Sequence, residues 1–282
     1  MSETESYTIP GAKVLLMGDS GTGKTHTLRT LIDAGIKPFI IFTEPGMELL
    51  SDLPADKVHW KYIPPVVEGW QGLVGIAQKT NSMDSKTLVN LKDPQRQAYN
   101  QFIKVLETCN DFVCDRTGES FGDVGNWQTD RALVFDSMTG LNKMVSKLVI
   151  GGRPIAQMAE WQLMQNNMRG FIDKITTGLQ CFVIVTAHQD REKDEITGGT
   201  SIMVKSLGAK LAPEIPLFFS DVIQTIRVGD EFSWSTAGAN VSVKARNVPI
   251  SSKIPPSFAP LIEKWKARGG KVQETPVSNS QQ

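Results

Sequence analysis

The chain has 282 residues, and its 30 lysines and arginines balance 30 aspartates and glutamates, so the formal net charge is zero. This balance excludes a global field that would draw the protein onto nucleic acid or an anionic membrane. The three cysteines, Cys109, Cys114 and Cys181, are too few for a disulfide framework, and no apolar run is long enough to span a bilayer. We therefore expect a soluble intracellular protein with one elaborated α/β domain, without a membrane partner.

The first motif along the chain is a phosphate-binding loop. Residues 18–25 read Gly-Asp-Ser-Gly-Thr-Gly-Lys-Thr and fit G-x-x-x-x-G-K-[ST] at every fixed position. An apolar run over 13–17 predicts a buried strand leading in, and apolar residues at helical spacing over 26–34 predict a helix leading out. Such a loop aims backbone N–H groups at phosphates. The predicted nucleotide-binding residues are Gly18, Asp19, Ser20, Gly21, Thr22, Gly23, Lys24, Thr25 and His26.

The residue types of this loop predict ATP and Mg²⁺ as cofactors. Lys24 supplies a point charge to the β- and γ-phosphates, and the Thr25 hydroxyl is placed for Mg²⁺. A second apolar run, from Arg131, ends at Asp136 and has the form of a Walker B element. Asp136 would hold Mg²⁺ through its water shell, with Ser137 helping to orient it. Thr25 and Asp136 are therefore the predicted metal residues.

Two more polar residues follow predicted buried strands. Glu44 comes directly after a strand over 38–43, where a general base could activate a water beside the γ-phosphate; the alternative is a solvated turn residue. A strand over 181–186 leads to His188 and Gln189, either of which could contact the γ-phosphate. A histidine without a functional role remains the alternative there.

Residues 64–130 are predicted to be an excursion inserted into one domain that spans 11–268. A half-buried strand over 57–63 precedes it, with His59 expected on the strand surface. The excursion is expected to contain helices over 66–78 and 95–109, a polar loop over 81–94, and a hairpin or irregular loop over 111–130.

The second half of the domain is expected to complete the sheet. After Walker B, the pattern predicts helices over 142–150 and 155–178, a mobile segment over 190–206, strands over 216–227, 232–236 and 241–244 that form an antiparallel edge, and a helix over 258–268. Residues 1–10 are expected to be a flexible N-terminus without a secretory signal, and residues 269–282 a disordered tail.

With the P-loop, Glu44, Asp136-Ser137 and a strand ending in Thr-Ala-His, the chain resembles the RecA-like ATPases. It is most similar to the compact phage nucleotide-binding proteins related to phage single-strand-annealing recombinases. The resemblance covers about residues 12–246 and implies a RecA-like P-loop NTPase fold, α/β, with a mostly parallel central sheet flanked by helices and an antiparallel edge extension. It also implies that Glu44 activates water and that His188 senses the γ-phosphate.

The family's other functional residues map onto basic positions of this chain. Lys244 and Arg246 would reach across a subunit interface to a neighbour's nucleotide; two ordinary surface cations are the alternative. The DNA-facing loops of the family would correspond to residues 151–154, with Arg153, and to residues 190–206. The second segment contains Arg191, Lys193 and Lys205. Acidic residues in the second segment nearly cancel its charge, which weakens the expectation of tight single-strand binding.

The resemblance implies a Mg²⁺-dependent ATPase acting in phage DNA recombination or replication, in the cytoplasm of the bacterial host. Its expected partners are further copies of itself in a ring or filament, single-stranded DNA, and other phage recombination or replication proteins. Two other classes of function remain open for this chain. A nucleotide-gated scaffold would bind ATP with little turnover, and a small-molecule phosphotransferase would use the excursion as its acceptor pocket.

Overall fold

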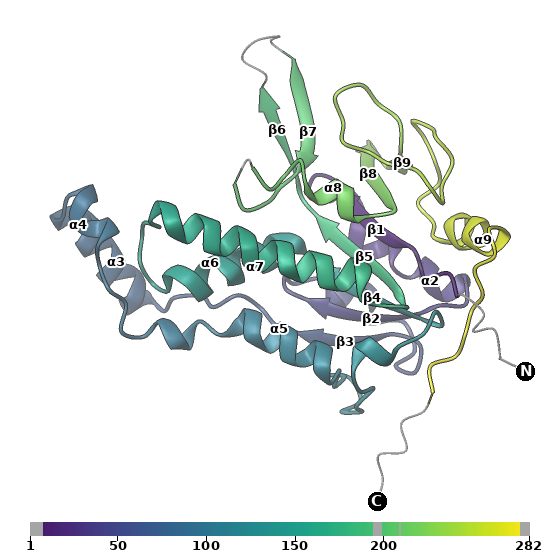
Figure 1. Ribbon diagram of the computed structural model, residues 1–282, viewed down its shortest axis with the longest axis horizontal. Coiled ribbons are helices and arrows are strands. Elements are labelled where there is room, and N and C mark those ends of the chain that lie inside the picture. The colour runs from purple at the N-terminus through teal and green to yellow at the C-terminus, as the bar shows by residue number, and fades with distance from the viewer. Residues whose placement is uncertain (1–7, 194–198, 209, 277–282) are drawn as a thin grey trace, which may run out of the picture.

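A mostly parallel seven-stranded sheet forms the centre of the protein (Figure 1), as seen in a computed structural model that describes residues 8–193, 199–208 and 210–276. The strand order is β3-β2-β4-β5-β1-β8-β9, and only β9 runs antiparallel to its neighbour. The strands are β1 Lys13–Met17, β2 Lys37–Phe42, β3 His59–Tyr62, β4 Arg131–Asp136, β5 Phe182–Ala187, β8 Asp221–Val228 and β9 Glu231–Ser235. This confirms the predicted sheet with its antiparallel edge.

Helices cover both faces of the sheet because the central strands are apolar on both sides. In β1, Leu15 and Met17 belong to one core cluster and Val14 and Leu16 to the other. The first cluster is completed by α5 Gln101–Asn110, α6 Met138–Ile150, α7 Met158–Thr177 and the short α8 Ile215–Phe218. The second is completed by Leu28, which directly follows α1 Lys24–Thr27, by α2 Thr30–Asp33 and by α9 Ala259–Ala267.

The predicted excursion is more helical than its sequence pattern indicates. It contains α3 Trp70–Ser82, α4 Ser85–Val89 and α5, joined by the 3₁₀ helix η2 Arg96–Ala98; two further 3₁₀ helices are η1 Met47–Leu50 and η3 Val124–Asn126. The helix α4 lies in the predicted polar loop, and its first turn is capped by the Asp84 carboxylate, which accepts from Thr87 N at 2.7 Å.

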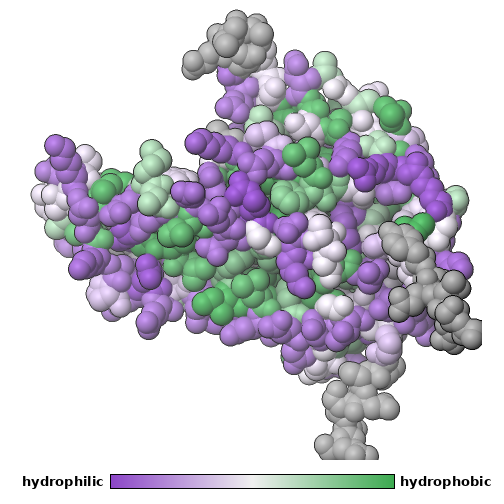
Figure 2. Space-filling view, viewed as in Figure 1, coloured by the Kyte–Doolittle hydropathy of each residue, from purple (hydrophilic) through white to green (hydrophobic). Residues whose placement is uncertain are grey.

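The helices α3 and α4 form an arm that projects from the body (Figure 1). No residue of α3 is buried, and its Trp70 side chain is 85% exposed. In the space-filling view, hydrophobic side chains gather between this arm and α5, whereas hydrophilic ones dominate the outline (Figure 2).

The structure corrects the sequence predictions at three places in the second half. The segment over 190–206, expected to be mobile, contains β6 Gln189–Lys193 paired with β7 Thr200–Val204, while its residues 194–198 lie outside the described residues. The strand expected over 216–227 begins as α8, with Pro216 in its first turn, and the strand expected over 241–244 makes only isolated bridges.

His59 is a further correction, because it is 3% exposed rather than on the surface. The segment that follows α5 covers this face of β3. Phe121 of that segment lies 4.3 Å from the His59 ring, and Phe39 of β2 stacks on the ring at 4.6 Å. The alternating pattern of an edge strand could not show this cover, since it comes from residues more than fifty positions away.

The predicted disordered tail is ordered in its first part. Thr129 Oγ1 donates to Lys271 O and accepts from Gln273 N, and the Asp130 carboxylate accepts from Thr275 N at 3.0 Å. Residues 277–282 of that tail, and residues 1–7 of the predicted flexible N-terminus, lie outside the described residues. None of the described helices is both long and apolar enough to cross a lipid bilayer.

Candidate functional site

The P-loop connects β1 to α1 and lines a pocket of about 220 Å³ at the carboxyl edge of the sheet. Gly21 and Gly23 have φ values of 74° and 83°, a conformation that favours glycine. Gly18 is needed for a different reason, because a Cβ at this position would lie 2.1 Å from Thr225 Oγ1 of β8. The loop therefore has the tight curvature of a phosphate-binding nest.

Lys24 begins α1 and turns its side chain back over the loop. Its Nζ donates to Gly18 O at 2.9 Å and to Asp19 O at 2.8 Å. Burial lowers the pKa of Lys24, and the nearby Asp136 carboxylate opposes that shift. The ammonium group is thus held at the mouth of the loop, where phosphate oxygens would meet it.

Asp136 is the last residue of β4 and lies opposite the loop. Thr25 Oγ1 donates to Asp136 Oδ2 at 2.6 Å, and Thr186 Oγ1 of β5 donates to Asp136 Oδ1 at 2.5 Å. Burial raises the pKa of Asp136, while these two hydroxyl donors act in the opposite direction. The peptide bond that follows, Asp136-Ser137, is cis.

These oxygen atoms fit Mg²⁺, which prefers hydroxyl, carboxylate and phosphate oxygens. The Thr25 hydroxyl and the Asp136 carboxylate already converge on one point. The described residues contain no cluster of three or more histidines, cysteines or carboxylates that could bind a metal without help. Mg²⁺ would therefore have few protein ligands here, with the rest of its shell from phosphate and water.

The sequence analysis missed Thr186. Its signal was available: Thr186 is a polar residue near the end of the otherwise apolar β5, and β5 is the neighbour of β4 in the sheet. Only the sheet order shows that Thr186 faces Asp136.

Glu44 follows β2 and lines the same pocket, as predicted. Its Oε2 accepts from Ser137 Oγ at 2.5 Å, and its Oε1 lies 3.6 Å from Lys143 Nζ of α6. His188 Nε2 lies 3.9 Å from Glu44 Oε2. The ends of β2, β4 and β5 therefore bring Glu44, Ser137 and His188 to one place.

Of the two candidates after β5, only His188 lines the pocket. Gln189 turns toward β8, where its Oε1 accepts from Gln224 Nε2 at 2.9 Å. Burial lowers the pKa of His188, the Lys24 ammonium lowers it further, and the Glu44 carboxylate opposes both. The lowered pKa favours the neutral imidazole, which can donate one hydrogen bond.

Lys244 and Arg246 do not line this pocket. The Lys244 ammonium donates to Phe219 O of its own chain at 2.7 Å, and burial lowers the pKa of Lys244. The Arg246 backbone N–H is bonded to Asp221, but the residue itself is exposed. Of the two, Arg246 is thus the one whose charged group can meet another molecule.

The four predicted DNA-contacting residues differ in their surroundings. The Arg153 side chain is only 8% exposed, pairs with Glu160 and donates to Ile150 O, so its charge is not available to a phosphate. Glu160 is held near Arg153 because its carboxylate also takes part in the capping box at the start of α7. Arg191, Lys193 and Lys205 are all exposed, and Arg191 also lies 2.9 Å from the Asp19 carboxylate of the P-loop.

A family model described as "AAA domain" matches residues 10–236. A search of the curated proteins finds no match. Among solved structures, an ATPase from the type III secretion system of pathogenic bacteria is 15% identical with a TM-score of 0.36, and the match covers 77% of this chain and 53%, about half, of that chain. The RadB recombinase is 14% identical with a TM-score of 0.29, over 79% of this chain and 77% of that chain.

Proposed function

This chain belongs to the AAA domain family, and from that premise we propose that it binds ATP with Mg²⁺ at the P-loop and hydrolyses it. One observation carries the proposal. The Thr25 hydroxyl and the Asp136 carboxylate, 111 positions apart, are hydrogen-bonded at the mouth of a glycine-lined phosphate nest.

The loop and Lys24 would bind the phosphates. Backbone N–H groups around Gly21 and Gly23 would donate to phosphate oxygens, and Lys24 would exchange its two carbonyl acceptors for the β- and γ-phosphates. Thr25 and Asp136 would hold Mg²⁺, which when bound neutralises charge on the transferring phosphoryl group.

Glu44 is the proposed general base. Its carboxylate is fixed by Ser137 on one oxygen and approached by Lys143 on the other, so it is positioned at the pocket wall rather than free in solvent. In this position it would accept a proton from the attacking water. The neutral His188, next to it, would donate to the γ-phosphate and so report whether that group is present.

The nucleobase has a separate candidate position. A hollow of about 570 Å³ adjoins the P-loop on its outer side and is lined by Gly23, His26, Leu49 and Phe232. The Phe232 ring is 42% exposed, and Arg227 lies over it at 5.1 Å. An exposed aromatic ring beside a phosphate nest offers a stacking surface for a planar base, and we place the base there.

The finer parts of the function are proposals that rest on the resemblance. We infer a homo-oligomer in which Arg246 of one subunit approaches the nucleotide of the next, and single-stranded DNA as a ligand near Arg191 and Lys193, in phage recombination or replication. Exposure of Arg246 supports the first part. Fluorescence anisotropy with labelled single strands, with and without ATP, tests the second, and a salt-insensitive or absent signal rejects it.

Replacing Lys24 by alanine tests ATP hydrolysis. The variant loses the cation that faces the β- and γ-phosphates, so Mg²⁺-dependent phosphate release should fall by about a hundredfold or more. Lys57→Ala removes an exposed lysine that does not line the nucleotide pocket, and it is the matched control. Equal phosphate release from Lys24→Ala, Lys57→Ala and the unchanged protein would reject the ATPase proposal.

A further inference from the structure

A groove of about 900 Å³ opens beside the nucleotide pocket. Glu44 and His188 line both the groove and the pocket, so the two spaces are contiguous. The apolar walls of the groove are Pro64, Pro65, Val66, Val67, Ile150 and Leu207. The nucleotide proposed above does not use this space.

The charges around the groove are mainly positive. Lys143, Lys147 and Lys205 line it, and Glu44 is the one acidic residue among the described lining residues. Lys143 is 61% exposed at its side chain although it lies 3.6 Å from Glu44, and Lys147 pairs with Glu68 at 3.2 Å. Within the described residues, Lys205 takes part in no ion pair, so its charge is available to a ligand.

Two polar atoms of groove-lining residues lack partners. Thr139 Oγ1 and Asn142 Oδ1 are buried, and neither forms a hydrogen bond. Asn142 is 8% exposed, and its Nδ2 donates to Lys205 O at 3.2 Å, which leaves the carbonyl oxygen as the free acceptor. A buried acceptor without a donor costs free energy, so this part of the groove wall is not fully satisfied by the described residues.

We propose that this groove binds a polypeptide segment of another protein, one that carries apolar side chains and carboxylates. Its apolar side chains would pack against the proline and valine wall, and its carboxylates would pair with Lys143 and Lys205. The observations favour a polypeptide over a nucleic acid strand. Among the described residues no arginine lines the groove, and Tyr62 is the only aromatic lining residue apart from His188, so the groove lacks the guanidinium groups and stacking rings that bind single strands.

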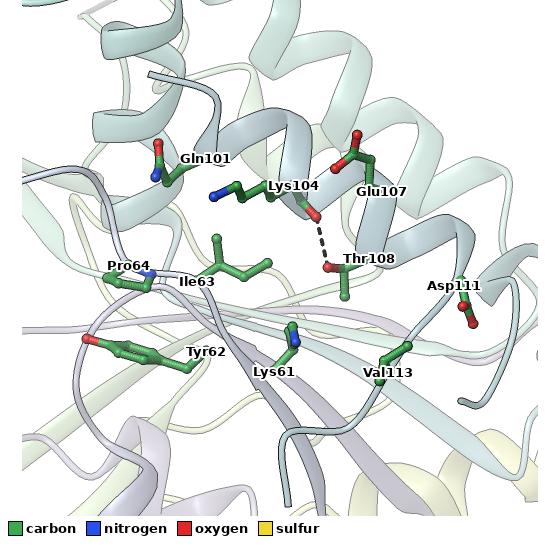
Figure 3. Close-up of a pocket in the computed structure, with 10 residues that line it drawn as sticks. All are labelled: Lys61, Tyr62, Ile63, Pro64, Gln101, Lys104, Glu107, Thr108, Asp111 and Val113. Atoms are coloured by element: carbon green, nitrogen blue, oxygen red, sulfur yellow. Dashed lines mark hydrogen bonds between the residues drawn. The ribbon is translucent and has the colours of Figure 1, made fainter. Parts of the chain in front are cut away.

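The groove continues beyond Tyr62 and Pro64, which also line a neighbouring hollow of about 480 Å³ between β3 and α5 (Figure 3). In this view the Lys104 side chain extends from α5 across the hollow toward Ile63. The buried Oε1 of Gln101, in the same wall, also lacks a partner. The hollow carries charges of both signs, since Glu107 and Asp111 line it together with Lys61 and Lys104, so it extends the length of the groove but not its positive charge.

Binding in the groove would also affect nucleotide turnover, a step that rests on the proposed function. A ligand carboxylate that draws Lys143 away from Glu44 changes the charge next to the proposed base. Binding itself is independent of catalysis. It is measured without nucleotide, so loss of the ATPase proposal leaves this test intact.

The test uses three fluorescent probes on the full chain: a synthetic peptide of alternating leucine and glutamate, a leucine-lysine peptide of equal length, and an oligo-dT strand. The acidic peptide should bind saturably, and the other two should not compete with it. Val67→Asp and Lys205→Glu change exposed side chains of the groove, and each should weaken binding by about tenfold or more. Lys266→Glu makes the same charge change on α9, outside the groove, and should leave binding unchanged.

Several outcomes would overturn the proposal. They are no saturable binding of the acidic peptide, equal binding of the leucine-lysine peptide, or an affinity that neither groove variant lowers. Competition by oligo-dT that the same variants abolish would assign the groove to nucleic acid instead. Circular dichroism of each variant separates a loss of binding from a loss of fold.

Discussion

Asp136 illustrates at the scale of single residues how tertiary contacts complete a site. Its carboxylate is buried and yet accepts two hydroxyl donors from different elements, Thr25 of α1 and Thr186 of β5. These donors orient both of its oxygens. If Asp136 holds Mg²⁺ as proposed, its carboxylate is already directed toward the P-loop, with little reorganisation needed on binding.

Phe232 should affect the affinity for ATP but not that for inorganic triphosphate. Phe232→Ala removes the ring against which we place the base, so ATP affinity should fall by about tenfold, while tripolyphosphate, which has no base, should bind as before. Titration calorimetry of both ligands with Mg²⁺ measures this. Val228→Ala, an exposed apolar residue on the same hairpin, is the control. An equal loss for both ligands would place the base elsewhere.

His59 should make the protein less stable in mild acid. Burial lowers the pKa of His59 from 6.5 to about 4, with Lys37 and Arg131 adding to the effect. The folded protein then binds this proton less well than the unfolded chain does. The contribution of His59 to the free energy of unfolding is therefore fully present above pH 6.5. It is lost as the pH falls toward 4, by up to about 3 kcal/mol.

Urea unfolding of His59→Phe at pH 7 and pH 4.5 isolates that contribution. The phenylalanine ring can keep the stacking contact with Phe39 but cannot be protonated. The fall in the free energy of unfolding between the two pH values should therefore be smaller in the variant. If both proteins lose the same free energy, His59 is not the group responsible.

At the scale of elements, the segment over 271–275 acts as an additional strap along residues 128–130. It forms several hydrogen bonds there, among them those between Gln273 and Thr129 and between Thr275 and Asp130. A chain that ends at Gly270 should lose about 2 kcal/mol of unfolding free energy, since a net contribution of about 1 kcal/mol per bond is offset by ordering entropy.

A chain that ends at Pro276 keeps these hydrogen bonds and is the control for that truncation. Denaturant titrations of both truncated chains give the difference. Should the two chains unfold at the same denaturant concentration, the strap does not stabilise the domain.

At the scale of the whole molecule, the proposed oligomer predicts complementation between subunits. Arg246→Ala should bind ATP and lose turnover, because the cation it removes acts on a neighbour's nucleotide, while Lys24→Ala should lose its own site. In a mixture of the two inactive variants, an Arg246→Ala subunit still has Lys24 at its own nucleotide and can receive Arg246 from a neighbouring Lys24→Ala subunit. The mixture should therefore regain part of the phosphate release. Light scattering with ATP measures the assembly, and a monomer with full activity would contradict the prediction.

The sequence by itself determined the strands β1, β2, β4 and β5, the P-loop, and the positions of Thr25, Glu44 and Asp136. It could do so because apolar periodicity and glycine spacing are local and a strand's carboxyl end follows directly from them. Only the tertiary structure decided that Thr186 meets Asp136, that His188 rather than Gln189 faces the pocket, and that Glu160 neutralises Arg153. The order of strands in the sheet and the pairing of charges between distant elements produce these contacts, and no periodicity along the chain encodes them.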